Sequence, residues 1–275
     1  MNNRFLLVKV LIALIVKVGG GVAGFLAVVA ITRSLGAEDA GIYFLAFSLV
    51  SLFAVIARVG LDGTVLRYTS SGEYNVSNVI YKSIAITCAM GLSVVLVIYT
   101  FSPFISEEIF GKSQLAPVLA SMAPGVLGLG LIAVGAAGLQ GLGNTAFSIF
   151  SLNIGVNLFL VAYLYFGNDD IGVSDVAHIF SLATFCVAFM TIIVLFFTGK
   201  GIDRDIIEWG SMFNSCIPLC VVLVVNQVVQ WVGQFSVGVY LSSDNVAFLA
   251  AAQRTAMLSS FILMAINYVV TPKLS

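Results

Sequence analysis

Four ionisable side chains lie inside otherwise apolar stretches, where they can do electrostatic chemistry. Arg58 and Asp62 are four residues apart at the end of the uncharged run GIYFLAFSLVSLFAVIA, residues 41–57. Lys17 and Arg254 lie in two other apolar runs. A charge at the centre of a membrane-spanning helix costs roughly 2.5–3.5 kcal/mol on insertion scales, so such residues usually face the bundle interior or a hydrated cavity.

Two interpretations of Arg58 are compatible with each other. As i and i+4 neighbours, Arg58 and Asp62 can form an ion pair on one helix face. Alternatively, Arg58 lines a cavity together with Lys17, and the two cations receive an anion. Asp62 is also a candidate proton or sodium site, and Lys17 can instead extend its amine to the membrane interface.

The position of Arg254 favours a cavity more directly. It lies ten residues past Asp244, which corresponds to about 15 Å along a helix. This depth is too great for easy extension to the interface, and no acidic residue is its neighbour in the sequence.

Amide side chains form a second candidate feature. In NQVVQWVGQ, residues 226–234, the amides Asn226, Gln230 and Gln234 recur every four residues, with Gln227 beside them. This polar stripe can hold helices together through hydrogen bonds, or it can line an aqueous path for a sugar.

Two smaller patterns favour packing over ligand binding. Asn153 and Asn157 form a shorter amide pair, which we interpret as a contact between helices. The glycines of GGGVAG, residues 19–24, are typical of close helix packing.

The composition identifies the solvent that must surround these residues. Of the 275 residues, 60% are hydrophobic and 9% are charged, against about 45–50% and about 25% in soluble domains. A chain this apolar is expected to be dissolved mostly in lipid. The net charge of −1 gives no indication of a nucleic-acid partner. The four cysteines lie in apolar runs and are expected to be buried without forming disulfides.

Eight apolar runs are long enough to span a bilayer, which takes about 20 residues. Their approximate limits are 11–33, 41–66, 83–105, 115–139, 145–167, 175–198, 212–240 and 246–270. The predicted fold class is therefore all-α, a polytopic membrane helix bundle. With a cytoplasmic N-terminus, the inner segments carry seven Lys and Arg residues and the outer segments two, so the distribution of positive charges favours that orientation.

A shift of 206 residues aligns 35–67 with 241–273 and pairs Glu38 with Asp244 and Arg67 with Lys273. Internal repeats of this kind are common in secondary transporters. We expect a first six-helix lobe over 1–205 and the first two helices of a second lobe over 206–275. On this interpretation the chain is incomplete by about four helices.

No constellation typical of an enzyme is present in the sequence. GKS at 111–113 lacks the earlier glycine of a phosphate-binding loop, and GLGNTA at 141–146 joins two membrane helices without a strand. His178 is the only histidine, which excludes a multi-histidine metal site. We therefore predict that the protein is not an enzyme and uses no cofactor.

Two blocks of sequence resemble a known family. Residues 18–68 combine a glycine-bearing first helix with Arg33, Leu35, Gly36, Glu38, Gly41 and Tyr43, and end in Gly60, Leu61, Asp62 and Arg67. This block resembles the polysaccharide transporters of the multidrug/oligosaccharidyl-lipid/polysaccharide exporter superfamily. A second block ends in Pro272 and Lys273, as in that family, but has Ala247 and Phe248 where the family often has G-x-Y.

The resemblance implies two six-helix lobes around a central cavity and a flippase for polyprenyl-diphosphate-linked oligosaccharides in the inner (plasma) membrane. Similar flippases use cavity arginines on helices 1, 2 and 8, where this chain has Lys17, Arg58 and Arg254. The implied partners are a lipid-linked oligosaccharide (an O-antigen, capsule or exopolysaccharide repeat), membrane lipid, a glycan polymerase and chain-length proteins. Two alternatives stay open: a cation-coupled multidrug antiporter of the same fold, and a non-transporting membrane scaffold of a glycan-assembly complex.

Overall fold

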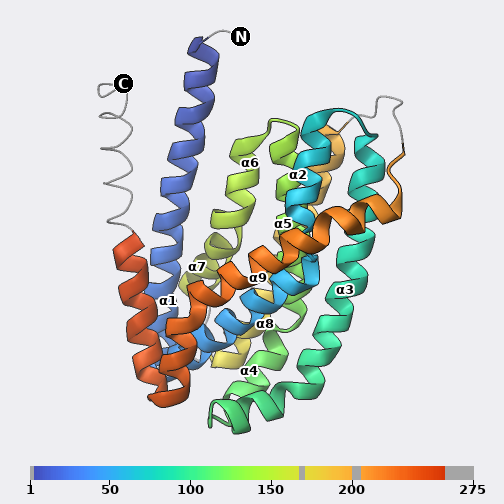
Figure 1. Cartoon of the computed structure of the whole chain (residues 1–275). Helices are drawn as coiled ribbons and strands as arrows, with labels where there is room; N and C mark the ends of the chain where they lie inside the picture. The colour runs from blue at the N-terminus through green and yellow to red at the C-terminus, as the bar shows by residue number, and fades with distance from the viewer. Residues whose placement is uncertain (1–2, 167–170, 200–205, 258–275) are drawn as a thin grey trace, which may run out of the picture.

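The computed structural model describes residues 3–166, 171–199 and 206–257, and its ordered elements are helices (Figure 1). They are α1 (Asn3–Arg58), α2 (Leu61–Ser71), α3 (Val76–Phe104), η1 (Ile105–Ile109), α4 (Leu115–Met122), α5 (Pro124–Gly141), α6 (Thr145–Phe150), η2 (Ser151–Gly155), α7 (Val156–Phe166), α8 (Val173–Thr198) and α9 (Trp209–Tyr240). A last helix covers 243–257, and residues 258–270 of the predicted eighth run lie outside the described part. The predicted all-α class is confirmed.

The first two predicted runs are continuous except for one sharp bend. Gly36 has φ 79° and ψ 175°, while the residues on both sides are helical. A positive φ of this kind is accessible to glycine at little cost. The first two predicted runs left residues 34–40 as a non-helical link. That link is wrong, because only Gly36 departs from helical geometry and the helix resumes directly after it.

The second predicted run, 41–66, is interrupted near its end. Val59 and Gly60 both have positive φ, so α1 ends at Arg58 and α2 begins at Leu61. A Cβ at Gly60 would lie 2.6 Å from the carbonyl oxygen of Cys216, so glycine also lets α9 approach closely here. The break places Arg58 and Asp62 on two different helices.

Six helical stretches of the described chain are long and apolar enough to cross a membrane. The first, Ile12–Arg58, has 47 residues, about 70 Å of helix, which is more than twice the apolar thickness of a bilayer. The bend at Gly36 lets it cross twice. These stretches agree with the first seven predicted spans and form a multi-pass membrane protein. Of the eighth span, the structure describes the helix up to residue 257.

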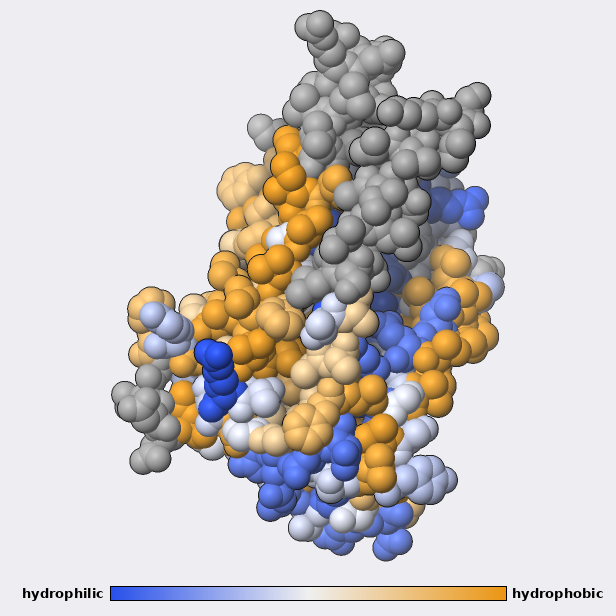
Figure 2. Space-filling model, turned by 90° about the vertical axis from the view of Figure 1, so that its left-hand side faces the viewer, coloured by the Kyte–Doolittle hydropathy of each residue, from blue (hydrophilic) through white to orange (hydrophobic). Residues whose placement is uncertain are grey.

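One end of the bundle is tightly closed. The backbone of α1 at Gly41 meets that of Ser243 so closely that a Cβ on Gly41 would lie 1.9 Å from the Ser243 carbonyl oxygen. The Lys112 amine donates to the carbonyl oxygens of Gly238 and Leu241 at 2.9 Å each, where α9 ends. Hydrophilic residues gather at the lower end in Figure 2, the end that holds the bend of α1, η1 and the end of α9 in Figure 1.

Candidate functional site

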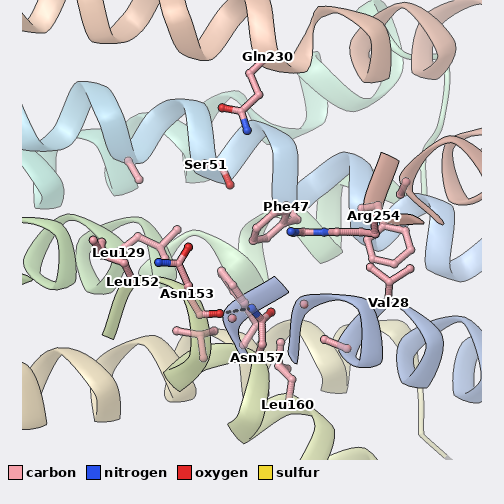
Figure 3. A pocket seen from close by; sticks show the side chains of 18 of the residues that line it. Val28, Phe47, Ser51, Leu129, Leu152, Asn153, Asn157, Leu160, Gln230 and Arg254 are labelled. Atoms are coloured by element: carbon pink, nitrogen blue, oxygen red, sulfur yellow. Dashed lines mark hydrogen bonds between the residues drawn. The ribbon is translucent and has the colours of Figure 1, made fainter. Parts of the chain in front are cut away.

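A cavity of about 740 Å³ lies between both halves of α1, the α5 to α7 segment, α9 and the helix over 243–257 (Figure 3). This volume accommodates a drug-sized or disaccharide-sized molecule, since ligand pockets commonly measure about 300–1,000 Å³. Its walls combine apolar side chains with cations and amides. Candidate residues that the sequence analysis identified lie together in this cavity, although they are far apart along the chain.

All three predicted cations, Lys17, Arg58 and Arg254, line this cavity. They come from the first half of α1, the end of α1 and the last described helix. No aspartate or glutamate, Asp62 included, is among the described residues that line it. The cavity therefore favours an anion, because cations in a poorly hydrated space attract negative charge strongly.

Arg254 reaches the cavity through a gap left by a glycine. A Cβ at Gly24 would lie 3.2 Å from Nη1 of Arg254, so a larger residue there would press on the guanidinium. In Figure 3 the guanidinium points toward the centre of the cavity, next to Phe47. Its one described side-chain hydrogen bond is weak, from Nη1 to Sδ of Met257 at 3.9 Å. Its N–H donors are thus free to bind phosphate oxygens, to which arginine can form bidentate hydrogen bonds.

Arg58 and Asp62 form the ion pair predicted from their spacing. Nη1 of Arg58 lies 3.6 Å from Oδ2 of Asp62, and their side chains are 19% and 23% exposed. The pair is incompletely satisfied, since Nε of Arg58 and Oδ1 of Asp62 are buried and have no hydrogen-bond partner among the described residues. The ion-pair prediction is confirmed, and Arg58 belongs to the pair and to the cavity wall at once.

Replacing Asp62 by asparagine is expected to lower the thermal midpoint by about 2–4 °C, the shift that roughly 1 kcal/mol produces in a chain of this size. The cause is a half-buried guanidinium left without its countercharge. The double variant Arg58→Gln/Asp62→Asn should be less destabilised than the sum of the two single variants, because contacting charges are coupled. Purely additive midpoints in detergent would contradict the pairing.

The amide stripe of α9 only partly faces the cavity. Gln230 and Gln234 line it, together with Gln227, whereas Asn226 is exposed and lies outside the lining. Helical geometry explains this difference. Eight residues turn a helix by about 80° beyond two full turns, so Asn226 faces away from Gln234, while Gln227 is within about 20° of it. The four-residue spacing predicted that Asn226, Gln230 and Gln234 share one face of the helix. The face of α9 that lines the cavity instead carries Gln227, Gln230 and Gln234.

The smaller amide pair also lies at the cavity. Asn153 and Asn157 line it, and Nδ2 of Asn157 donates to the carbonyl oxygen of Asn153 at 2.9 Å (Figure 3). A Cβ at Gly20 would lie 2.6 Å from Cβ of Asn153, so this glycine allows α1 to pack closely, as predicted. Two further lining residues, Trp231 and Gln253, were missed, although each adjoins a predicted residue in the sequence.

The fold and the cavity define a multi-pass α-helical membrane protein with a cationic, amide-lined chamber. The sequence model of a family described as "Polysaccharide biosynthesis protein" matches residues 6–275. The chain belongs to this family, which confirms the suspected resemblance. No curated protein matches the chain significantly by sequence.

Two solved structures show the same fold. The structure of the MATE multidrug transporter DinF-BH superposes with a TM-score of 0.70 at 14% identity, covering 95% of this chain and 62% of that one. A structure described as "protein A" superposes with a TM-score of 0.64 at 13% identity, covering 98% of this chain and 64% of that one. The chain thus spans somewhat less than two thirds of the length of either structure.

Proposed function

We propose that this protein moves polyprenyl-diphosphate-linked oligosaccharide units from the cytoplasmic to the outer face of the inner membrane by alternating access. The observation that carries the proposal is the charge of the cavity: Lys17, Arg58 and Arg254 line it, and no described carboxylate does. A lipid diphosphate concentrates negative charge at one point, which three cations in a low-dielectric wall attract strongly. Membership of a polysaccharide biosynthesis family supports this substrate class.

The walls supply a place for each part of such a substrate. The diphosphate lies between the three cations, and the sugars lie along the amides of α9. The polyprenyl chain stays in lipid, because the apolar surfaces of α1 and α9 are exposed, including Ile15 and Val229. The protein therefore encloses the polar head and leaves the lipid tail outside.

The closed end of the bundle indicates which way the cavity opens. If the N-terminus is cytoplasmic, as the positive charges favour, then the contacts of Gly41 with Ser243 and of Lys112 with α9 lie at the outer face. The cavity is then reached from the cytoplasmic side, where the substrate is assembled. Outward release requires these contacts to separate, with the two groups of helices rocking about the cavity.

The proposal is tested with Arg58→Ala in cells that depend on the protein for a surface glycan. We expect surface glycan to fall by about tenfold or more at an equal amount of protein in the membrane, since one of the three phosphate-binding cations is lost. Arg33→Ala is the matched control, because Arg33 is exposed and does not line the cavity. Undiminished glycan export by the Arg58 variant would contradict the proposal.

A cation-coupled antiporter of the same fold is the second candidate function. The observation that favours it is the buried Oδ1 of Asp62, which has no partner among the described residues. This oxygen is a candidate proton or sodium ligand beside the cavity wall. The two functions are separated by the charge of the transported molecule, since the antiporter would accept cations and the flippase an anion.

A further inference from the structure

Two buried polar atoms on the α9 wall have no partner among the described residues. They are Nε1 of Trp231 and Oε1 of Gln234, and both side chains line the cavity. Gln234 is only 1% exposed, and its Nε2 donates to the carbonyl oxygen of Phe44 at 2.9 Å. This bond fixes the orientation of the amide, so its oxygen is left as an unused acceptor. Buried polar groups are normally hydrogen-bonded, and these two exceptions require an explanation.

The two atoms have opposite and complementary hydrogen-bonding roles. The indole N–H of Trp231 can only donate, and the amide oxygen of Gln234 can only accept. Three residues apart on one helix, the two side chains are neighbours on the same face. A hydroxyl group both donates and accepts, so a single hydroxyl can satisfy both atoms. Neither a phosphate oxygen nor an alkyl chain can do so.

The surroundings match a sugar ring. The indole contacts Phe47 edge to face, with ring centroids 5.8 Å apart and planes at 84°. Gln227 and Gln230 extend the polar wall along α9. Figure 3 shows Arg254 directed toward Phe47 from the right and Gln230 extending downward from α9 at the top of the view. An aromatic ring, amides and a cation therefore line the same cavity, a combination that suits a sugar attached to a phosphate.

We propose that Trp231 and Gln234 form a carbohydrate subsite, in which a hydroxyl of the sugar next to the diphosphate accepts from the indole N–H and donates to the Gln234 amide oxygen. This inference rests on the proposed function. Both atoms are covered in the present structure, so the subsite is completed as the sugar enters. Phe47, which contacts the indole, borders this subsite.

The test measures the affinity of the whole protein in detergent by equilibrium dialysis. The probes are farnesyl diphosphate and farnesyl diphosphates that carry one glucose, galactose or N-acetylglucosamine. We expect Trp231→Phe to bind at least one sugar-bearing probe about three- to tenfold more weakly, the effect of one lost hydrogen bond, and to bind the bare probe equally well. Gln234→Met should show the same selective loss, which keeps the test valid if one variant fails to fold.

The chain provides its own matched control in Trp209, the other of its two tryptophans. Trp209 contacts the Lys82 amine at 5.0 Å and does not line the cavity. Trp209→Phe should leave the affinity for every probe unchanged. In that variant Trp231 is the single tryptophan, and its selectively excited fluorescence should change with a sugar-bearing probe but not with the bare one.

The possible results separate the subsite from the function on which it rests. If the bare probe binds, but the sugar adds nothing or Trp231→Phe weakens both kinds of probe alike, the subsite is wrong and the phosphate site stands. If neither kind of probe binds to the unmodified protein, the proposed function fails and the subsite fails with it.

Discussion

Replacing Arg254 by glutamine is expected to weaken the binding of a polyprenyl diphosphate by roughly ten- to a hundredfold. A hydrogen bond to a charged group contributes about 1.5–3 kcal/mol, and the guanidinium of Arg254 has no described carboxylate that already neutralises it. Glutamine keeps two donors but removes the charge. The measurement is equilibrium dialysis of labelled farnesyl diphosphate against the purified protein.

Two controls identify the cause of this loss. Arg254→Lys keeps the positive charge but removes the planar guanidinium and its bidentate donors, so it should retain an intermediate affinity for the diphosphate. Arg33→Gln removes an exposed arginine outside the cavity and should bind like the unmodified protein. Equal affinities for Arg254→Gln and Arg33→Gln would show that Arg254 takes no part in binding the diphosphate.

Replacing Gly41 by valine is expected to reduce the yield of folded protein to about a tenth or less. The Cβ would lie 1.9 Å from the carbonyl oxygen of Ser243 and 2.5 Å from its carbonyl carbon. These are backbone atoms, which cannot turn aside as a side chain can, and overpacking of a close contact typically costs about 1–3 kcal/mol or more. Folded yield is measured by fluorescence-detected size exclusion of a tagged protein.

The matched control for Gly41 is Gly233→Val on α9. No heavy atom lies within 4 Å of the Cβ that would be added there. Both changes place a β-branched residue in a membrane helix, so an equal loss of yield in the two variants would point to valine itself. A normal yield for Gly41→Val would mean that α1 and the 243–257 helix do not meet as described.

The helical layout and the cations of the cavity were predictable because each depends on local sequence. Uncharged runs of about 20 residues determine where helices cross, and a charge within such a run has few tolerable surroundings. Lys17, Arg58 and Arg254 can therefore be identified from the sequence alone. The break at Val59–Gly60 cannot, since a single glycine near the end of a membrane run is also compatible with a continuous helix.

The finer contacts were not predictable, because they depend on how distant helices meet. The bond from Gln234 to Phe44 joins residues 190 positions apart, and no periodicity in the sequence reports it. Asn226 illustrates a different limit. A four-residue repeat drifts around a helix that has about 3.6 residues per turn, so the first member of the stripe is turned out of the cavity that the others line. The division into lobes at residue 205 and the internal repeat remain predictions.

The central claim is that this cavity selects a lipid by its phosphate charge, and a ligand series tests it most directly. Binding of farnesol, farnesyl monophosphate, farnesyl diphosphate and the lipophilic cation tetraphenylphosphonium is compared by equilibrium dialysis against the same protein. We predict that affinity rises with each added phosphate and that the cation does not compete with the diphosphate. Equal affinity for farnesol and farnesyl diphosphate, or tighter binding of the cation, would contradict the account.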